Sequence, residues 1–283
     1  MKPAVLLQTD FSLTWGAVAS MKGVMKRVDP TLELIDLCHD IKAFDPWEAS
    51  LSLSAVEPCW PSGTVFVSVV DPGVGTHRRA CAAKLLDGSF VVTPDNGTLT
   101  HLKHGVGIAE IREIDERTNR WHGLEEVSVF HGRDLFGYCA ARLAAGVISF
   151  AEIGACYPVE EIVECEEYRL LPRLEAGRAA GFLMTGLHHF GGVTASITNQ
   201  DFLGCGFSEG DMTRVVISKA GRRCFDAPVP FVHAFGDVPQ GAVLLYRGSS
   251  GYLCLDVNQG NFMKRFDIGF GREWTISIEN MNT

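Results

Sequence analysis

The sequence predicts an α/β domain with a largely parallel central sheet, followed by an all-β domain. In the first half, short apolar strands alternate with amphipathic helices, an order that gives parallel strands joined by right-handed crossovers. In the second half, short β-like runs are separated by Gly, Pro and Asp turns without any long helix; these runs are Gly181–Thr185, Thr213–Ser218, Val243–Tyr246, Tyr252–Leu255 and Trp274–Ile278. That pattern is typical of a barrel or a sandwich.

The stretch Val65–Arg79 is the part of the first domain that most suggests a site. It begins with an apolar run, which indicates a strand buried on both faces of a sheet. The run stops at Asp71, because the following Pro72 cannot continue a β ladder. Ligands of open α/β sheets bind beyond this carboxyl end of the strands. We interpret Asp71, two glycines, Arg78 and Arg79 as a polar site; the alternative is a tight loop that holds a salt-bridged aspartate.

A second strand, Ala4–Thr9, ends in the same way at Asp10, so that two strands bring an acid to one edge of the sheet. His131 follows a further predicted strand, Val127–Phe130. A lone His after a strand is more often structural than catalytic, but the Gly, Arg and Asp that follow His131 make a functional role more plausible than usual. The other elements predicted in this half are a helix from Ala17 to Val28, a strand at Leu32–Leu37, a helix from Pro46 (with Asp45 as N-cap) to about Glu57, a hairpin of Ala80–Leu86 with Phe90–Thr93, and a helix from Leu135 to Gly146.

Composition excludes several classes of protein. The chain has 283 residues, 46% of them hydrophobic and 21% charged, as in soluble globular proteins. Its net charge of −9 argues against a nucleic-acid or anionic-membrane surface, and no segment is long enough to span a bilayer. The nine cysteines are scattered without metal-ligand spacing, and no signal peptide precedes them. We therefore expect a cytoplasmic protein with reduced thiols, no metal site and no cofactor.

An acidic stretch, Val159–Glu175, interrupts the βα rhythm and marks the expected domain boundary. The predicted domains are residues 1–170, the α/β domain, and residues 171–283, the β domain.

Several motifs occur in one order along the chain, and together they resemble the S-adenosyl-L-methionine (SAM) hydroxide adenosyltransferases, relatives of the enzymes that fluorinate and chlorinate the same substrate. The resemblance is close over roughly the first 150 residues and looser beyond them. The motifs are Thr9-Asp10-Phe11, Met21-Lys22-Gly23-Val24, Asp71-Pro72-Gly73-Val74-Gly75-Thr76, Arg78-Arg79, Pro94-Asp95-Asn96-Gly97, His131-Gly132-Arg133-Asp134, Phe190-Gly191, Gly248-Ser249-Ser250-Gly251-Tyr252-Leu253 and Asn258.

The resemblance implies a C-terminal β-barrel and a homotrimer, in which each active site lies between one subunit's N-terminal domain and its neighbour's barrel. The implied reaction is attack by water or hydroxide on ribose C5′ of SAM, which gives adenosine and L-methionine. By motif position, Asp71, Arg78 and His131 form the triad that positions and activates the water. The halogenating relatives lack this triad, so its presence favours oxygen as the nucleophile.

The resemblance also implies a set of substrate-binding residues. Asp10 would bind the ribose hydroxyls, and Phe44 stands where the halogenating relatives carry a Trp near the ribose. Ser249 is the expected partner of the methionine carboxylate. The remaining positions carried over as substrate-binding are Gly132, Phe190, Ser250 and Asn258.

Two positions depart from the family pattern D-x-x-F-G-N. Leu187 replaces the acid expected at the methionine ammonium, and Gly192 replaces the Asn expected near adenine. His188 or His189 would replace that acid poorly, because a neutral imidazole is a weak partner for an ammonium. A hydrolase of another 5′-activated nucleoside and a non-catalytic nucleoside-binding protein are therefore the alternatives to SAM hydrolysis.

The chemistry of the reaction agrees with the triad. A sulfonium leaves as a neutral thioether, so the leaving group needs no general acid. Free water has a pKa of about 15.7 and must be oriented and partly deprotonated by side chains. Either Asp71 or His131 can accept the proton, and Arg78 can hold the acid ionised or stabilise hydroxide character.

Overall fold

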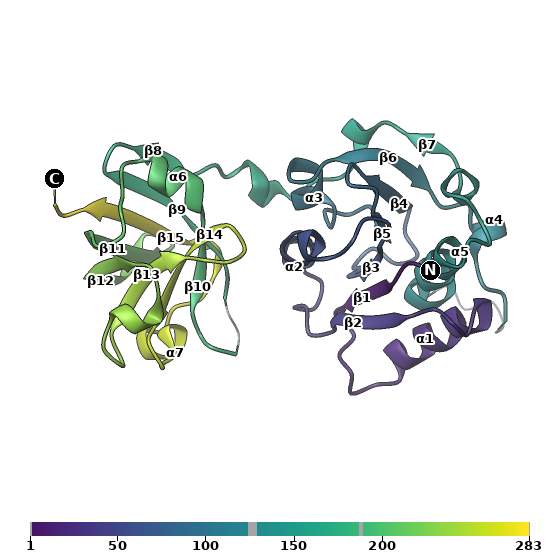
Figure 1. Ribbon diagram of the computed structural model, residues 1–283, viewed down its shortest axis with the longest axis horizontal. Coiled ribbons are helices and arrows are strands. Elements are labelled where there is room, and N and C mark those ends of the chain that lie inside the picture. Colours follow the sequence, from purple (N-terminus) through teal and green to yellow (C-terminus); the bar gives the residue numbers. More distant parts are fainter. Residues whose placement is uncertain (1, 124–128, 187–188, 283) are drawn as a thin grey trace. The chain divides into compact units, whose positions relative to one another are not determined.

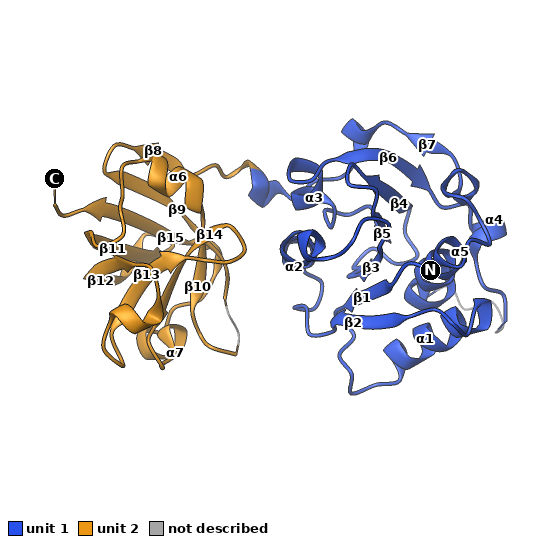
Figure 2. Ribbon diagram, viewed as in Figure 1, with its two compact units in different colours: residues 1–168 blue, residues 169–283 orange. Residues whose placement is uncertain are grey.

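The computed structural model describes residues 2–123, 129–186 and 189–282. The chain divides into two compact units, unit 1 (Met1–Tyr168) and unit 2 (Arg169–Thr283), which are coloured separately in Figure 2. Each unit has its own hydrophobic core and its own sheet.

Unit 1 is built on a seven-stranded sheet in the order β2-β1-β3-β5-β4-β6-β7 (Figure 1). The strands β2, β1, β3 and β5 are parallel neighbours, whereas β4, β6 and β7 pair antiparallel at one side. The elements are β1 (Val5–Thr9), α1 (Ala17–Val28), β2 (Leu34–Cys38), α2 (Pro46–Val56), β3 (Val65–Val69), β4 (Ala80–Leu85), β5 (Phe90–Pro94), α3 (Thr100–His104), β6 (Ile108–Glu113), α4 (Glu116–Asn119), η2 (Gly132–Gly137, a π-helical turn), α5 (Tyr138–Ala144) and β7 (Cys156–Tyr157).

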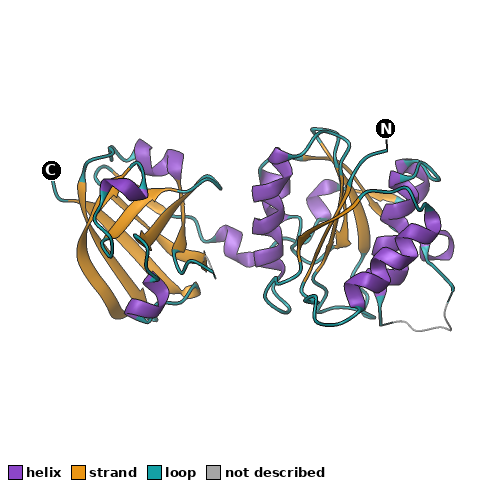
Figure 3. Cartoon of the chain, turned by 60° about the horizontal axis from the view of Figure 1, so that its bottom comes forward, coloured by secondary structure: helices purple, strands orange, loops and turns teal. Residues whose placement is uncertain are grey.

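Helices cover both faces of this sheet, as Figure 3 shows. Successive strand residues point to opposite faces. Leu7 and Val67 therefore pack with α1 and α5 in one apolar cluster, while Leu6 and Phe66 pack with α2 and α3 in another. Burial on both faces explains why these strands are apolar without alternation, and it confirms the predicted α/β class with a largely parallel centre.

The structure corrects parts of the predicted order in unit 1. The predicted hairpin forms, as the antiparallel pair β4 and β5. The predicted strand Val127–Phe130 is wrong where it is described, because Val129 lies in a turn and Phe130 in a loop; residues 127 and 128 lie outside the described residues. Asp45 caps α2 as predicted, and its carboxylate accepts the Glu48 N–H at 3.1 Å.

Unit 2 is a closed barrel rather than a sandwich. Its strands follow the order β10-β14-β13-β12-β11-β15-β9, and β9 also pairs with β10, which closes the ring; β8 extends β9 outside it. The elements are β8 (Arg173–Glu175), β9 (Arg178–Gly186), β10 (Val193–Thr198), α6 (Asn199–Gly204), β11 (Met212–Lys219), β12 (Arg222–Val232), β13 (Val243–Arg247), β14 (Tyr252–Val257), α7 (Phe262–Phe266) and β15 (Gly271–Asn280).

The predicted runs in the second half correspond to five of these strands, whereas β8, β10 and β12 were not predicted. The barrel core consists of the inward-facing residues of every strand in the ring, closed by phenylalanines from α6 and α7. Within the described residues, no helix combines the length and the apolar character needed to cross a membrane.

Candidate active site

Arg78 links the three triad candidates into one cluster in unit 1. Its Nε donates to Asp71 Oδ1 at 2.9 Å and to Oδ2 at 3.1 Å, and Nη2 donates to Oδ2 at 2.5 Å. The same Nη2 donates to His131 Nδ1 at 2.9 Å. The side chains of Asp71 and Arg78 are 6% and 10% exposed, and His131 is 7% exposed. The sequence-predicted triad is therefore a buried, hydrogen-bonded unit.

The turn after β3 gives this cluster its shape. Gly75 has a φ of +76°, which glycine adopts readily. A Cβ added at Gly73 would lie 3.1 Å from Arg78 Cγ, so a side chain there would press on the arginine stem. On the other side, Asn96 Nδ2 donates to the Val70 carbonyl at 2.8 Å and fixes the end of the strand. The Pro94-Asp95-Asn96-Gly97 motif thus supports the site from β5.

The contact with Arg78 decides the tautomer of His131. A guanidinium has only N–H donors, so Nδ1 must offer its lone pair and the proton of the neutral ring lies on Nε2. Burial, together with the charges of Arg78 and Arg120, lowers the pKa of His131. Arg120 is also only a donor, but its Nη1 pairs with Glu116 and lies 3.5 Å from Nε2, a much weaker contact than the 2.9 Å contact at Nδ1, so the Arg78 contact decides the tautomer. His131 is therefore a neutral imidazole with an N–H on the side away from Arg78.

The residues that follow His131 have structural partners. Arg133 and Asp134 form a buried pair, with Nε to Oδ1 at 2.5 Å, and the Arg133 guanidinium lies over the Phe130 ring. A Cβ on Gly132 would lie 3.0 Å from the Phe11 ring. Gly132, predicted to bind substrate, therefore also provides the room in which Phe11 packs against η2.

Asp10 lies at the end of β1, where the Phe44 backbone N–H donates to its Oδ2 at 3.0 Å. Phe44 has a φ of +66°, a left-handed conformation that is uncommon for a bulky residue, and its side chain is exposed. The two residues predicted to bind the ribose are thus brought together, and the strained Phe44 turn orients the carboxylate of Asp10.

Sequence reasoning missed a polar chain beneath Asp10. His39 is buried, and its ring joins Thr9 Oγ1 (2.9 Å from Nδ1) to Asp36 Oδ1 (2.8 Å from Nε2). Lys22 then donates to Asp36 at 2.7 Å. This chain fastens the end of β1 to β2 and α1. The Met21-Lys22-Gly23-Val24 motif contains one of its members, but nothing in the sequence pairs that lysine with His39.

The barrel residues predicted to bind substrate have different surroundings. Ser249 and Ser250 are exposed at the tip of the β13–β14 hairpin, and Phe190 is exposed beside Gly191. Asn258 donates through Nδ2 to the carbonyls of Phe235 and Val238, at 3.0 and 2.8 Å, so its amide group fastens the loop that follows β12.

The two departures from the family pattern fall in the loop before β10. Leu187 and His188 lie outside the described residues, whereas Gly192 is described. A Cβ at Gly192 would collide with the carboxylate of Asp256, which sequence reasoning did not single out.

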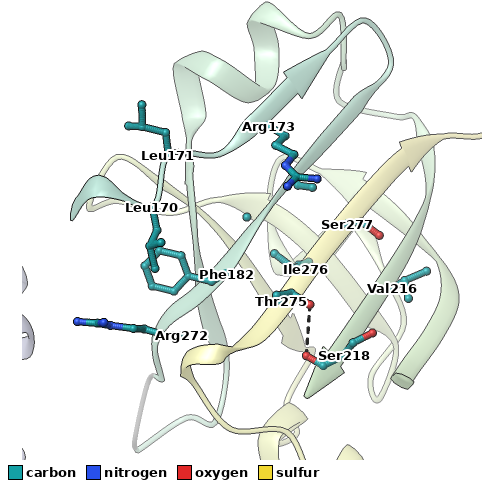
Figure 4. Close-up of a pocket in the computed structure, with 12 residues that line it drawn as sticks. Leu170, Leu171, Arg173, Phe182, Val216, Ser218, Arg272, Thr275, Ile276 and Ser277 are labelled. Atoms are coloured by element: carbon teal, nitrogen blue, oxygen red, sulfur yellow. Dashed lines mark hydrogen bonds between the residues drawn. The ribbon is translucent and has the colours of Figure 1, made fainter. Parts of the chain in front are cut away.

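A pocket of about 480 Å³ opens on another wall of the barrel, over β9, β15 and β11 (Figure 4). Arg173 and Arg272 stand at its sides, and Leu170 and Phe182 form part of its apolar lining. None of the residues predicted to bind substrate lines it. Among the described residues, no group of three or more His, Cys, Asp or Glu side chains is arranged to hold a metal ion.

Relatives with assigned names cover most of the chain. A protein named (R)-S-adenosyl-L-methionine hydrolase from Salinispora tropica is 34% identical over 261 residues, which are 91% of each chain. One of the same name from Thermus thermophilus is 33% identical over 268 residues, 92% of this chain and 94% of the relative. A fluorinase from Nocardia brasiliensis is 26% identical over 301 residues, 98% of this chain and 97% of the relative.

A solved structure and two family models match the chain over most of its length, as these relatives do. The crystal structure of an uncharacterized conserved protein from Thermotoga maritima matches with a TM-score of 0.86 and 32% identity, over 97% of this chain and 99% of that one. Residues 5–154 match the model of the SAM hydroxide adenosyltransferase N-terminal domain, and residues 187–275 match that of the C-terminal domain. The chain therefore belongs to the SAM hydroxide adenosyltransferase family.

Proposed function

We propose that this protein is a SAM hydrolase, which uses water to convert SAM into adenosine and L-methionine. The observation that carries the proposal is the guanidinium of Arg78, which joins Asp71 and His131 in one buried cluster at the carboxyl end of β3. Membership of the family and the names of the hydrolase relatives support the same reaction.

The hydrogen-bond directions divide the roles within the cluster. Among the described residues, no acceptor contacts Nη1 of Arg78, so its N–H groups and the Nε2–H of His131 are donors that can hold a water oxygen. Asp71 is the acceptor of the cluster, because the Nδ1 lone pair of His131 already binds Arg78. In this assignment Asp71 takes the proton, and the two donors stabilise hydroxide character on the oxygen.

The step balances without another reactant. The water oxygen forms a bond to C5′ while the C5′–sulfur bond breaks, and the electron pair of that bond goes to sulfur. Methionine leaves as a neutral thioether, and the water proton passes to Asp71 and then to solvent. Positive charge on the sulfonium is lost as the oxygen loses its proton, so a site from which bulk water is excluded strengthens the attraction between them.

The substrate-binding assignments and the assembly complete the proposal. Asp10 accepts from the ribose hydroxyls, Phe44 and Gly132 lie at the nucleoside, and Phe190, Ser249, Ser250 and Asn258 belong to the barrel side of the site. The triad lies in unit 1 and these four residues in unit 2, and, following the assembly that the family resemblance implies, we propose a homotrimer in which each barrel serves its neighbour's triad. A monomeric mass by light scattering at micromolar concentration would refute the trimer.

Hydrolysis in water enriched in oxygen-18 tests the reaction. Chromatography with mass detection should find adenosine and methionine in equal amounts, with the heavy oxygen in the 5′-hydroxyl of adenosine. Arg78→Gln should lose turnover, whereas the matched control Arg79→Gln should keep it, because Arg79 pairs with Glu161 instead. Tight nucleoside binding without any product would favour the non-catalytic alternative.

A further inference from the structure

Asp256 is a buried carboxylate that neither the predicted triad nor the predicted substrate residues use. It is 3% exposed, and it lies in β14. Leu255 and Val257 on either side of it belong to the barrel core. Since strand residues alternate between faces, Asp256 points away from that core, onto the outer side of the barrel wall.

The residues directly opposite Asp256 on the two adjacent strands are apolar or lack a side chain. Leu244 of β13 is its register partner on one side and belongs to a small apolar cluster with Val232 and Val238. On the other side, β10 begins with Val193 opposite Leu255, which places Gly192 beside Asp256. No cation stands next to the carboxylate in these pairings.

The position of Gly192 requires a glycine because a side chain would not fit there, and not because the backbone adopts a left-handed conformation. Its φ is not in the left-handed region, so the backbone would accept a side chain. That side chain would instead collide with Oδ2 of Asp256. The glycine therefore makes room for the acid, and the two residues form one feature.

The Asp256 carboxylate accepts fewer hydrogen bonds than its two oxygens allow. Within the described residues, its one hydrogen bond comes from the Val257 N–H to Oδ1 at 2.8 Å. Burial raises the pKa of Asp256, whereas that backbone hydrogen bond lowers it, and the net direction is upward. A buried carboxylate with a single donor favours a ligand that brings an N–H group.

We infer that Asp256, in the space that Gly192 leaves, accepts a hydrogen bond from the exocyclic amino group of the adenine ring. This inference rests on the proposed function, because it takes SAM as the molecule bound. Asp256 also lies among residues predicted to bind substrate: Gly192 follows Phe190 in the loop before β10, and Asn258 is two residues beyond Asp256.

SAM carries a second amino group, the methionine ammonium, but the geometry of β14 excludes the ammonium as the partner of Asp256. The ammonium and the carboxylate of methionine share one carbon, so their protein partners must lie within a few ångströms of each other. The expected carboxylate partner, Ser249, lies at the hairpin tip, roughly 20 Å from Asp256 along β14. Asp256 is therefore at the purine end of the substrate, not at the methionine end.

Nucleoside binding tests the inference without any variant. Isothermal calorimetry should show that the wild-type protein binds adenosine roughly ten- to a hundredfold more tightly than purine riboside, which lacks the amino group, or inosine, which has oxygen in its place. Equal affinities for the three nucleosides would overturn the inference.

Variants then show which residue causes the preference for adenosine. Asp256→Asn should remove the preference for adenosine over inosine, because a carboxamide can donate to the inosine oxygen. Gly192→Ala should weaken the preference with the acid still present, whereas Asp226→Asn, which changes a surface carboxylate paired with Arg214, should leave it intact. An unchanged preference in folded Asp256→Asn would overturn the inference.

The hydrolysis assay separates this result from the proposed function. Wild-type turnover of SAM without discrimination between adenosine and inosine would refute the role of Asp256 and leave the hydrolase assignment standing. Discrimination that Asp256→Asn abolishes, in a protein that forms no product, would support the role of Asp256 and refute hydrolysis.

Discussion

Removing Arg78 should affect stability and activity through the same buried contact. Arg78→Gln takes away three hydrogen bonds to Asp71, whose side chain is 6% exposed and has no other charged partner among its hydrogen bonds in the described residues. Breaking a buried pair by deleting one member typically costs about 3–5 kcal/mol, because the remaining charge is left without compensation. Turnover should fall by about 10²–10⁴ as the water loses its donor.

A double variant shows whether the cost comes from the isolated charge. Asp71→Asn in the Arg78→Gln background removes the stranded carboxylate, so most of the lost stability should return while activity stays absent. Arg79→Gln is the matched control: its pair with Glu161 is exposed, and its loss should cost about 1 kcal/mol or less.

Urea unfolding followed by circular dichroism measures these differences, at one fixed protein concentration because association adds to stability. The reasoning fails if Arg78→Gln costs no more than Arg79→Gln. It also fails if the double variant is no more stable than Arg78→Gln alone.

Three further predictions concern pH and the support of the site. Burial and the neighbouring Asp87 raise the pKa of Glu57 to about 7 from its ordinary 4.5, so the contribution of Glu57 to folding stability is fully present below pH 4.5 and falls by up to about 3 kcal/mol as pH rises to 7. Glu57→Gln should remove that contribution to the pH dependence in urea titrations, and an unchanged pH dependence would contradict it. The pKa of His131 is lowered by burial and by nearby charges that include Arg120. Arg120→Gln should therefore raise that pKa and shift the acidic side of the plot of kcat against pH to higher pH. An unshifted plot would show that Arg120 does not affect the titration of His131. His39→Ala removes the hydrogen bonds to Thr9 and Asp36, which should raise KM for SAM more than it lowers kcat and cost about 1–3 kcal/mol in unfolding free energy. An unchanged KM, or an unfolding free energy equal to that of the wild type, would argue against it.

The fold was largely predictable because its signals are local. The helix from Ala17 to Val28 has an apolar face with the right period and a proline just beyond its end, and α2 has a capping aspartate followed by proline. In its described part, the predicted strand before His131 is wrong, because Val129 lies in an exposed turn. There Phe130 lies under the Arg133 guanidinium instead of in a sheet.

The candidate site was predictable in part. Asp71, Arg78 and Asp10 follow strands that are evident from the sequence, and His131 was found through its motif. His39 and Arg120 were not found, because each acts through a partner distant in the sequence: His39 through Thr9, and Arg120 through His131. Gly192 was interpreted as the loss of a polar anchor, whereas the structure shows a carboxylate in the space beside it.

The sequence by itself determined the class of each half of the chain and the motifs at the ends of β1 and β3, since period, caps and turns depend on neighbours a few residues apart. The pattern of short strands in the second half was compatible with a barrel or a sandwich, and the barrel that the family resemblance implied is confirmed by the pairing of β9 with β10, which closes the ring. Only the tertiary structure decided that Nδ1 of His131 faces the Arg78 guanidinium and that Asp256 faces Gly192. These features depend on hydrogen-bond direction and strand register, which arise only when segments far apart in the chain are packed together.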